Sequence, residues 1–296
     1  MRIALFQAQT GLDPDRNAAA LVGRVHEAAA GGAAILFTPE MSGLLDRDRG
    51  RAMRHLHLQS DDPVLAAVRG AAREAGIWVH LGSLALLAED GDKLLNRGFV
   101  IDGAGEIRAS YDKIHLFDVD LPTGESWRES AAYERGGRSV VVDTPAGALG
   151  LSICYDLRFA GLFTALTNEG ATILSIPAAF TVPTGEAHWH VLLRARAIEA
   201  GAFVVAAAQV GQHEDGRVTY GHSLVVDPWG KVLLDMGAEG PGLGFAELDQ
   251  AAVEEVRQRL PAIWHRRPIP QPEHVRIIGS EAPRTSEPCP GDTASR

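Results

Sequence analysis

Cys154 occupies a position where a reactive side chain would be accessible to a small ligand. An apolar run from Ala148 to Ile153 has the length of a buried strand, and the cysteine follows it directly. A side chain at such a strand-to-helix turn lies at the edge of an α/β sheet where the strand ends form a ligand crevice. Free cysteine is more often an inert, buried side chain. A nucleophile here therefore also needs a base, an oxyanion donor and a pocket.

Two further ionisable residues follow predicted strands or hairpins. Glu40 comes directly after the apolar segment that ends in F-T-P, and Lys113 follows S-Y-D at the end of a predicted hairpin. Either residue alone is typically exposed to solvent. A carboxylate can nevertheless act as a general base for a thiol, and an ammonium can stabilise an oxyanion. We therefore expect these two side chains to converge with Cys154 in one sheltered crevice.

The elements that must position these residues alternate between strands and helices at both ends of the chain. In the middle, Asp90-Gly91 and Asp102-Gly103 are hairpin turn signals, which predict successive antiparallel strands over residues 77–111. The sequence thus predicts one α/β domain with a mixed sheet. The other predicted strands are 2–9, 33–38, 148–153, 171–177, 202–208, 221–227, 231–234 and 242–248, and the predicted helices are 14–30, 62–76, 157–170, 188–199 and 250–260.

Some segments have no regular pattern. Residues 112–138 form a predicted long loop whose aromatic and aliphatic side chains make it a candidate wall of a pocket. Residues 44–61 are charged and irregular, and we predict no element there. Residues 178–185 are predicted to form a loop before the helix at 188–199.

Composition excludes several classes of protein. The chain has 296 residues, of which 46% are hydrophobic, enough for a sizeable core. A formal net charge of -10 without a basic run argues against binding to nucleic acid or to an anionic membrane. We find no signal peptide, and no apolar stretch approaches the ~20 residues of a membrane span. Of the two cysteines, Cys289 lies in a polar tail, which indicates a reducing cytoplasm rather than a disulfide framework.

Motifs along most of residues 1–270 resemble the nitrilase superfamily of carbon-nitrogen hydrolases. The resemblance implies a four-layer α-β-β-α sandwich with mixed sheets, no metal or organic cofactor, and a homodimer or higher homo-oligomer. Residues 271–296 would be a C-terminal extension that is disordered from about residue 281. The motifs are F-T-P-E-M at 37–41, Y-D-K-I-H-L-F-D-V-D at 111–120, R-E-S at 128–130, G-L-S-I-C-Y-D-L-R-F at 150–159 and G-H-S-L-V-V-D-P-W-G at 221–230.

The resemblance also implies roles for individual residues. Its catalytic triad falls on Glu40, Lys113 and Cys154, and a second acid falls on Glu129, ranked above the Glu-Ser pair at 125–126. The thiol would attack an amide carbonyl to form a thioester, which water then hydrolyses. Glu40, with a pKa raised by burial, would carry the proton, while Lys113 and the backbone N–H of Tyr155 would hold the oxyanion.

Within the superfamily the chain is most similar to the branch of deaminated-glutathione amidases and ω-amidases. We therefore expect an amidase that hydrolyses a small carboxylate-bearing amide to an acid and ammonia, with deaminated glutathione as the first candidate substrate. Alternatives with the same triad are an ω-amidase acting on 2-oxoglutaramate or 2-oxosuccinamate, and an N-carbamoyl or nitrile hydrolase. A protein of another class, a non-catalytic thiol sensor that uses Cys154, also stays open.

Further residues are candidates for substrate binding. Arg158 suits a substrate carboxylate, although an ion pair with Asp156 is an equal alternative. Phe180 and Thr181 are candidates for the pocket wall, although an aromatic residue such as Phe180 is more often part of the core. The histidine pairs His55/His57 and His188/His190 do not form a complete ligand set, so we predict no metal site.

Overall fold

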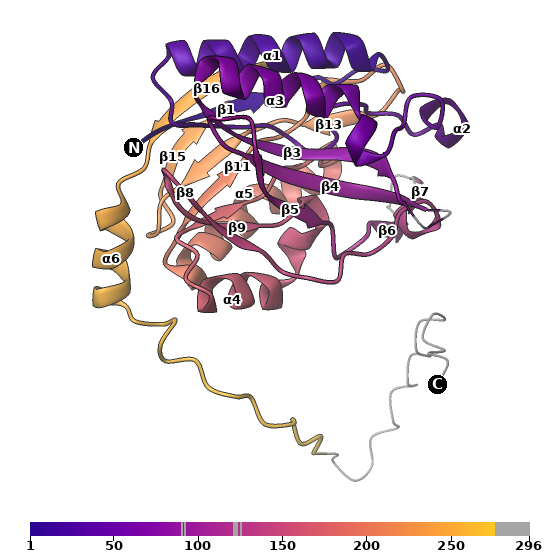
Figure 1. The fold of residues 1–296 in the computed structure, drawn as a ribbon. Helices are drawn as coiled ribbons and strands as arrows, with labels where there is room; N and C mark the ends of the chain where they lie inside the picture. Colours follow the sequence, from indigo (N-terminus) through magenta and orange to yellow (C-terminus); the bar gives the residue numbers. More distant parts are fainter. Residues whose placement is uncertain (90, 92, 121–123, 125, 276–296) are drawn as a thin grey trace. The chain divides into compact units, whose positions relative to one another are not determined.

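The computed structural model describes residues 1–89, 91, 93–120, 124 and 126–275 (Figure 1). The chain divides into two units, Met1–His265 and Arg266–Arg296. Helices and strands of the described residues all belong to the first unit, and residues 266–275 of the second have none. The predicted disorder from about residue 281 lies outside the described residues.

The first sheet has the strand order β16-β1-β2-β3-β4-β5. Strands β1, β2 and β3 are parallel, whereas the neighbours β16, β4 and β5 are attached in antiparallel pairs. The sheet is therefore mixed, and the predicted hairpins of residues 77–111 form its β3–β4–β5 side, which ends at the edge strand β5. Its strands are β1 (Arg2–Gln7), β2 (Ile35–Phe37), β3 (Trp78–Leu87), β4 (Leu94–Ile101), β5 (Ile107–Asp112) and β16 (Gly242–Glu247).

The second sheet has the strand order β15-β14-β11-β10-β9-β8. Strands β9, β10 and β11 are parallel, and the outer neighbours are antiparallel. In each sheet, a predicted reactive residue follows the end of a parallel strand. Glu40 follows β2 in the first sheet, and Cys154 follows β9 in the second. Its strands are β8 (Val141–Thr144), β9 (Gly147–Leu151), β10 (Ile173–Ser175), β11 (Phe203–Ala206), β14 (Leu224–Val226) and β15 (Val232–Asp235).

Helices cover the outer face of each sheet, as Figure 1 shows. Helices α1 (Pro14–Ala30) and α3 (Pro63–Ala75) pack on the first sheet, and α4 (Ala160–Asn168) and α5 (Val182–Ala200) pack on the second. Apolar side chains of both sheets fill the layer between them, and a second core lies between the first sheet and α1 and α3. The predicted four-layer α-β-β-α sandwich is thus confirmed.

Sequence signals for the ends of helices hold in the structure. Asp13 caps α1 ahead of Pro14, and the Asp62 side chain caps α3 by accepting from the Leu65 backbone N–H. Gly76 ends α3 in the left-handed conformation, with φ of 65°, which glycine adopts without a Cβ clash. The Asp249 side chain caps α6 (Gln250–Arg259) by accepting from the Ala251 N–H.

Other segments differ from the predictions. Helix α5 begins at Val182, ahead of the predicted start at His188, because Pro183 is tolerated in a first helical turn rather than marking a loop. Residues 112–138 contain the hairpin β6 (Asp118–Asp120) and β7 (Ser126–Arg128), and residues 44–61 contain α2 (Arg49–Ala52). A hairpin of β12 (Val210–Gln212) and β13 (Val218–Tyr220) had no prediction. None of the described helices combines the length and apolar character of a membrane span.

Candidate active site

Cys154 begins a 3-10 turn, Cys154–Arg158, directly after β9. Its backbone φ of 51° lies in the left-handed region, which residues with a Cβ rarely adopt. Contacts with the surrounding chain must therefore hold Cys154 in this conformation. The Cys154 N–H donates to the Pro177 carbonyl at 2.8 Å. The buried Asp156 carboxylate accepts from the Ile153 N–H at 2.9 Å and from the Tyr111 hydroxyl at 2.7 Å. These bonds fix the turn that presents the thiol.

Glu40, Lys113 and Glu129 form a compact ion cluster. Lys113 Nζ lies 2.8 Å from Glu40 Oε1 and 3.0 and 2.9 Å from the two Glu129 oxygens. The Lys113 side chain is 2% exposed, and the Glu40 side chain is 6% exposed. Glu40 follows β2 and Lys113 follows β5, so both come from the first sheet. Cys154 comes from the second sheet, so the site lies where the two sheets face each other.

Backbone and amide donors complete the cluster. Asn96 on β4 donates through Nδ2 to Glu40 Oε1 at 3.0 Å and to Glu129 Oε1 at 3.2 Å. The Ala179 N–H donates to Glu40 Oε2 at 3.1 Å, and the Phe117 N–H donates to Glu129 Oε2 at 2.6 Å. Both carboxylates are therefore held in defined orientations, and Asn96 links them.

Burial and charge set the protonation state of the site. Burial would raise the pKa of Glu40, but the Lys113 charge and hydrogen bonds from Cys154, Lys113 and Asn96 outweigh it and hold that pKa below its ordinary value. Burial would lower the pKa of Lys113, but the charges of Glu129 and Glu40 raise it well above its ordinary value. Burial and the Glu40 carboxylate raise the pKa of the Cys154 thiol.

These directions correct the expectation of a raised pKa at Glu40. The donors that surround its carboxylate stabilise the charged form more than burial destabilises it. At neutral pH the site thus contains a carboxylate at Glu40, an ammonium at Lys113 and a protonated thiol at Cys154. The thiol must lose its proton as it reacts, and Glu40 is the adjacent acceptor.

A cavity of about 550 Å³ opens beside the cluster. It brings together all the residues that the sequence nominated. Those residues are Glu40, Lys113, Glu129, Cys154, Tyr155, Arg158, Phe180 and Thr181.

The Arg158 guanidinium faces the cavity rather than Asp156. Its Nη1 lies 3.3 Å from His188 Nδ1, and its Cζ lies 5.7 Å from the centre of the Tyr155 ring and 5.6 Å from that of Phe180. The Asp156 oxygens accept instead from Tyr111, His115 and Ile153. The alternative of an Arg158–Asp156 ion pair is therefore not seen in the described residues, and Arg158 lines the cavity.

Several lining residues were not predicted. The unassigned segment 44–61 supplies Arg47 and Arg49, and the β12–β13 hairpin supplies Arg217, whose guanidinium lies 5.2 Å from the Trp127 ring centre. Their charges were visible in the sequence, but no periodicity placed them at the cavity. Asn96 had a local signal, because it lies with Arg97 in a strand whose other residues are apolar or glycine, and a buried amide needs a polar partner. Glu125 lies outside the described residues, and Ser126 donates to Asp120.

Comparisons with known proteins agree with this geometry. Residues 2–258 match the carbon-nitrogen hydrolase family model. The chain is 38% identical over 287 residues to deaminated glutathione amidase of Yersinia enterocolitica, covering 96% of each chain. Its structure is similar to that of the NitFhit protein of C. elegans, with a TM-score of 0.83 and 39% identity over 90% of this chain and 65% of that one.

A second solved structure bears on the cysteine. An amidase from Nesterenkonia sp., with a TM-score of 0.73 and 29% identity, covers 89% of this chain and 99% of that one, and carries acrylamide added covalently at its active-site cysteine. The sequence motifs and the sandwich agree with these matches. The chain therefore belongs to the carbon-nitrogen hydrolase family and is an amidase of the nitrilase superfamily.

Proposed function

We propose that this amidase cleaves deaminated glutathione through a thioester on Cys154. The observation that supports it is a cavity that is lined by Glu40, Lys113 and Cys154 and also by arginines. Arginine recognises carboxylates through paired hydrogen bonds, and deaminated glutathione carries a carboxylate at each end. The similar Yersinia protein bears the name of this activity. The arginines that line the cavity are Arg47, Arg49, Arg128, Arg158 and Arg217.

In the first half of the reaction, Cys154 Sγ bonds to the amide carbonyl carbon while Glu40 accepts the thiol proton. The carbonyl π electrons move to oxygen, and Lys113 Nζ with the Tyr155 N–H stabilises the resulting oxyanion. Tyr155 is the second residue of its 3-10 turn, where backbone N–H groups have no partner within the turn. When the oxyanion collapses, the C–N bond breaks and Glu40 gives its proton to the leaving nitrogen.

In the second half, water replaces the amine. Glu40 accepts a proton from water, whose oxygen bonds to the thioester carbon, and the C–S bond then breaks as the thiolate recovers the proton. Glu129 holds Lys113 Nζ through both carboxylate oxygens and so keeps the ammonium in place.

The leaving group depends on the substrate. Primary amides release ammonia, whereas the amide nitrogens of deaminated glutathione belong to amino-acid residues, so its cleavage releases an amine.

A substrate panel tests this proposal. The purified chain is incubated with deaminated glutathione, 2-oxoglutaramate, an N-carbamoyl amino acid and an aliphatic nitrile, and products are identified by mass spectrometry. We expect the largest kcat/KM for deaminated glutathione, with cysteinylglycine and 2-oxoglutarate as products. A larger value for 2-oxoglutaramate would favour the ω-amidase alternative. Absence of any product, with Cys154 still open to alkylation, would favour the thiol sensor.

We further propose that the chain assembles as a homodimer or larger homo-oligomer in the reducing cytoplasm. Catalysis requires a reduced Cys154 thiol, which that compartment maintains. Large exposed apolar side chains on neighbouring segments support self-association, because a contiguous apolar patch on a protein surface marks an interaction site. Light scattering after size exclusion is expected to give at least twice the mass of 31.6 kDa, and a monomer would contradict the proposal. These exposed side chains are Val191 and Ile198 on α5 and Trp229 and Leu233 around the β14–β15 turn.

A further inference from the structure

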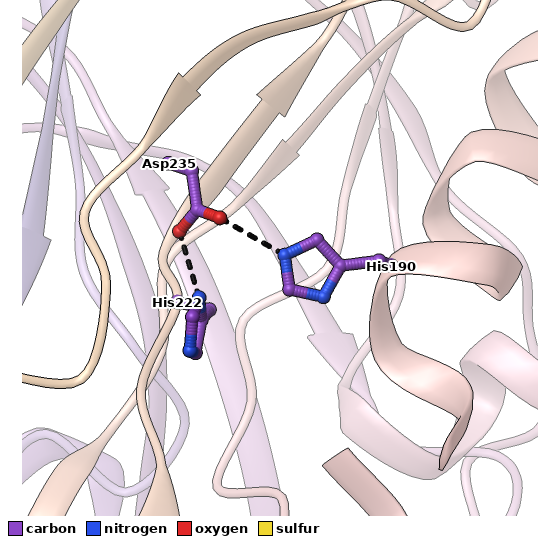
Figure 2. Close-up of side chains that lie close together, drawn as sticks. All are labelled: His190, His222 and Asp235. Carbon is purple, nitrogen blue, oxygen red and sulfur yellow. Dashed lines mark hydrogen bonds and ion pairs between the residues drawn. The ribbon is translucent and has the colours of Figure 1, made fainter. Parts of the chain in front are cut away.

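Two histidines and an aspartate lie close together where α5 packs beside the second sheet (Figure 2). His190 lies on α5, His222 lies between β13 and β14, and Asp235 ends β15. His190 Nε2 is 3.0 Å from Asp235 Oδ2, and His222 Nδ1 is 2.9 Å from Asp235 Oδ1. One ligand atom from each residue lies within 4.8 Å of the others. None of the three lines the cavity around Cys154 in the described part of the chain.

The surroundings hold these side chains in place. His222 has a φ of 53°, a left-handed conformation that is uncommon for a residue with a Cβ, and its N–H donates to the Gly237 carbonyl at 2.8 Å. The Tyr220 ring stacks on the His222 imidazole with centroids 4.3 Å apart. The Gly237 N–H donates to Asp235 Oδ1 at 2.9 Å. Both the imidazole of His222 and the carboxylate are therefore oriented before any ligand binds.

We propose that His190, His222 and Asp235 bind a divalent transition-metal cation of the Zn²⁺ type. Two imidazole nitrogens and a carboxylate oxygen are a donor set that this class of ion prefers. Ligand bonds of about 2.0–2.2 Å require donor atoms roughly 3.3 Å apart in a tetrahedron. The observed separations, 2.9 and 3.0 Å and at most 4.8 Å, bracket that value, so small rotations of the side chains suffice.

Besides these small rotations, binding requires only that protons move on the two imidazoles. Each imidazole turns a lone pair towards the ion and carries its proton on the other ring nitrogen. The ion then replaces the hydrogen atoms that link His190 Nε2 and His222 Nδ1 to Asp235. The side chains are 32% exposed at His190, 23% at His222 and 33% at Asp235, so the site is open to solution. Three protein ligands leave a fourth position for water.

The site would join separate parts of the second half of the chain. Its ligands come from α5, from the segment that precedes β14, and from β15. Trp189, next to His190, donates through Nε1 to the His222 carbonyl at 2.8 Å, so these segments are already in contact. An ion bound only by the folded chain stabilises it by mass action. The proposed role is therefore to stabilise this region, and the amidase chemistry does not depend on it.

Direct metal titration tests the proposal. A tag-free full chain carrying Cys154→Ala and Cys289→Ser lacks competing thiols and is titrated with Zn²⁺ by calorimetry and with Co²⁺ by visible absorption. We expect one ion per chain, Co²⁺ bands of a four-coordinate site and a higher Tm with metal. His190→Ala and Asp235→Asn, added to this background, should each weaken binding at least ~10-fold, the lower range for damage to a metal site.

The matched control is His26→Ala in the same background. His26 lies on α1, 45% exposed and 3.7 Å from Glu74, so it is a surface histidine beside a single acid. Its replacement should leave metal affinity unchanged. Circular dichroism without metal verifies that each variant is folded. The proposal is overturned if the parent binds no stoichiometric metal at micromolar concentration, or if Asp235→Asn and His190→Ala bind as well as the parent.

Discussion

The Glu40–Lys113–Glu129 cluster and the His190–His222–Asp235 cluster both place acids against nitrogen bases, but they differ in burial. Lys113 is 2% exposed, whereas the members of the histidine cluster are 23–33% exposed. In the buried cluster, loss of one charge leaves its partners without water to replace it. In the exposed cluster, water replaces a lost partner. Equivalent substitutions should therefore have large effects in the first and small effects in the second.

The largest effect is expected for Lys113→Met. It removes the ammonium that we propose binds the oxyanion, a contribution of about 10²–10³ in kcat. It also leaves the Glu40 and Glu129 carboxylates buried without a cation, a loss of about 3–5 kcal/mol in unfolding free energy. Enzyme kinetics and urea unfolding measure the two effects. Lys231→Met, at an exposed position, is the control and should change neither quantity. A folded Lys113→Met variant with normal kcat would remove Lys113 from the mechanism.

A smaller effect is expected for Asn96→Ala. The amide donates to the Glu40 and Glu129 carboxylates, and a hydrogen bond to a charged group contributes about 1.5–3 kcal/mol. We expect kcat to fall by roughly tenfold or more, with KM nearly unchanged, because the contact positions the base rather than the substrate. Asn17→Ala, which removes an amide bonded to the Gly11 and Gly43 carbonyls, is the control. A change in KM alone would place Asn96 in substrate binding.

The pH dependence of kcat/KM tests the protonation states of the buried cluster in the unmutated enzyme. Glu40 must be ionised to act as a base, and its pKa lies below the ordinary 4.5, so activity falls only as pH drops through that lower value. The thiol pKa lies well above the ordinary 9.0, so the thiol stays protonated throughout the neutral range. We expect a plateau from about pH 6 to 8. An acid limb with an apparent pKa near 6 or 7 would show that a different group is the base.

The smallest effect is expected for Asp235→Asn without metal. Partial burial raises the pKa of Asp235, but hydrogen bonds from His190, the Gly237 N–H and His222 bring it below the ordinary 3.8. Its contribution to stability is therefore present above pH 3.8 and is lost as pH falls through the folded-state value. Thermal unfolding with chelator should show a small deficit in Tm at pH 7 that shrinks as the pH falls below 3.8. A deficit as large as that of Lys113→Met would contradict the comparison.

Local signals predicted the parts of this molecule that local chemistry determines. The apolar run before Cys154 and the helices predicted over 14–30 and 250–260 each rest on a pattern within one continuous segment, and each element lies close to where it was predicted. Glu40 and Lys113 were nominated because each follows a predicted strand or hairpin, and the family motifs then added Glu129 and connected the three segments.

What the sequence did not predict depends on contacts between distant segments. The pKa of Glu40 is set by Lys113, Asn96 and Cys154, which belong to three other segments, so burial alone suggested the wrong direction. Residues 44–61 have no periodic pattern, and their place at the cavity follows from packing. The spacing of His188 and His190 did not indicate Asp235 as the partner of His190, because that pairing exists only in the folded chain.

Trapping the acyl-enzyme tests the central claim, that Cys154 attacks the amide, most directly. Reaction mixtures with deaminated glutathione are quenched in acid during turnover and measured by intact mass spectrometry and peptide mapping. We predict a covalent 2-oxoglutaryl group on the peptide that contains Cys154, and neither adduct nor product with a folded Cys154→Ala variant. Product formation by Cys154→Ala at a rate near that of the wild type would contradict the account.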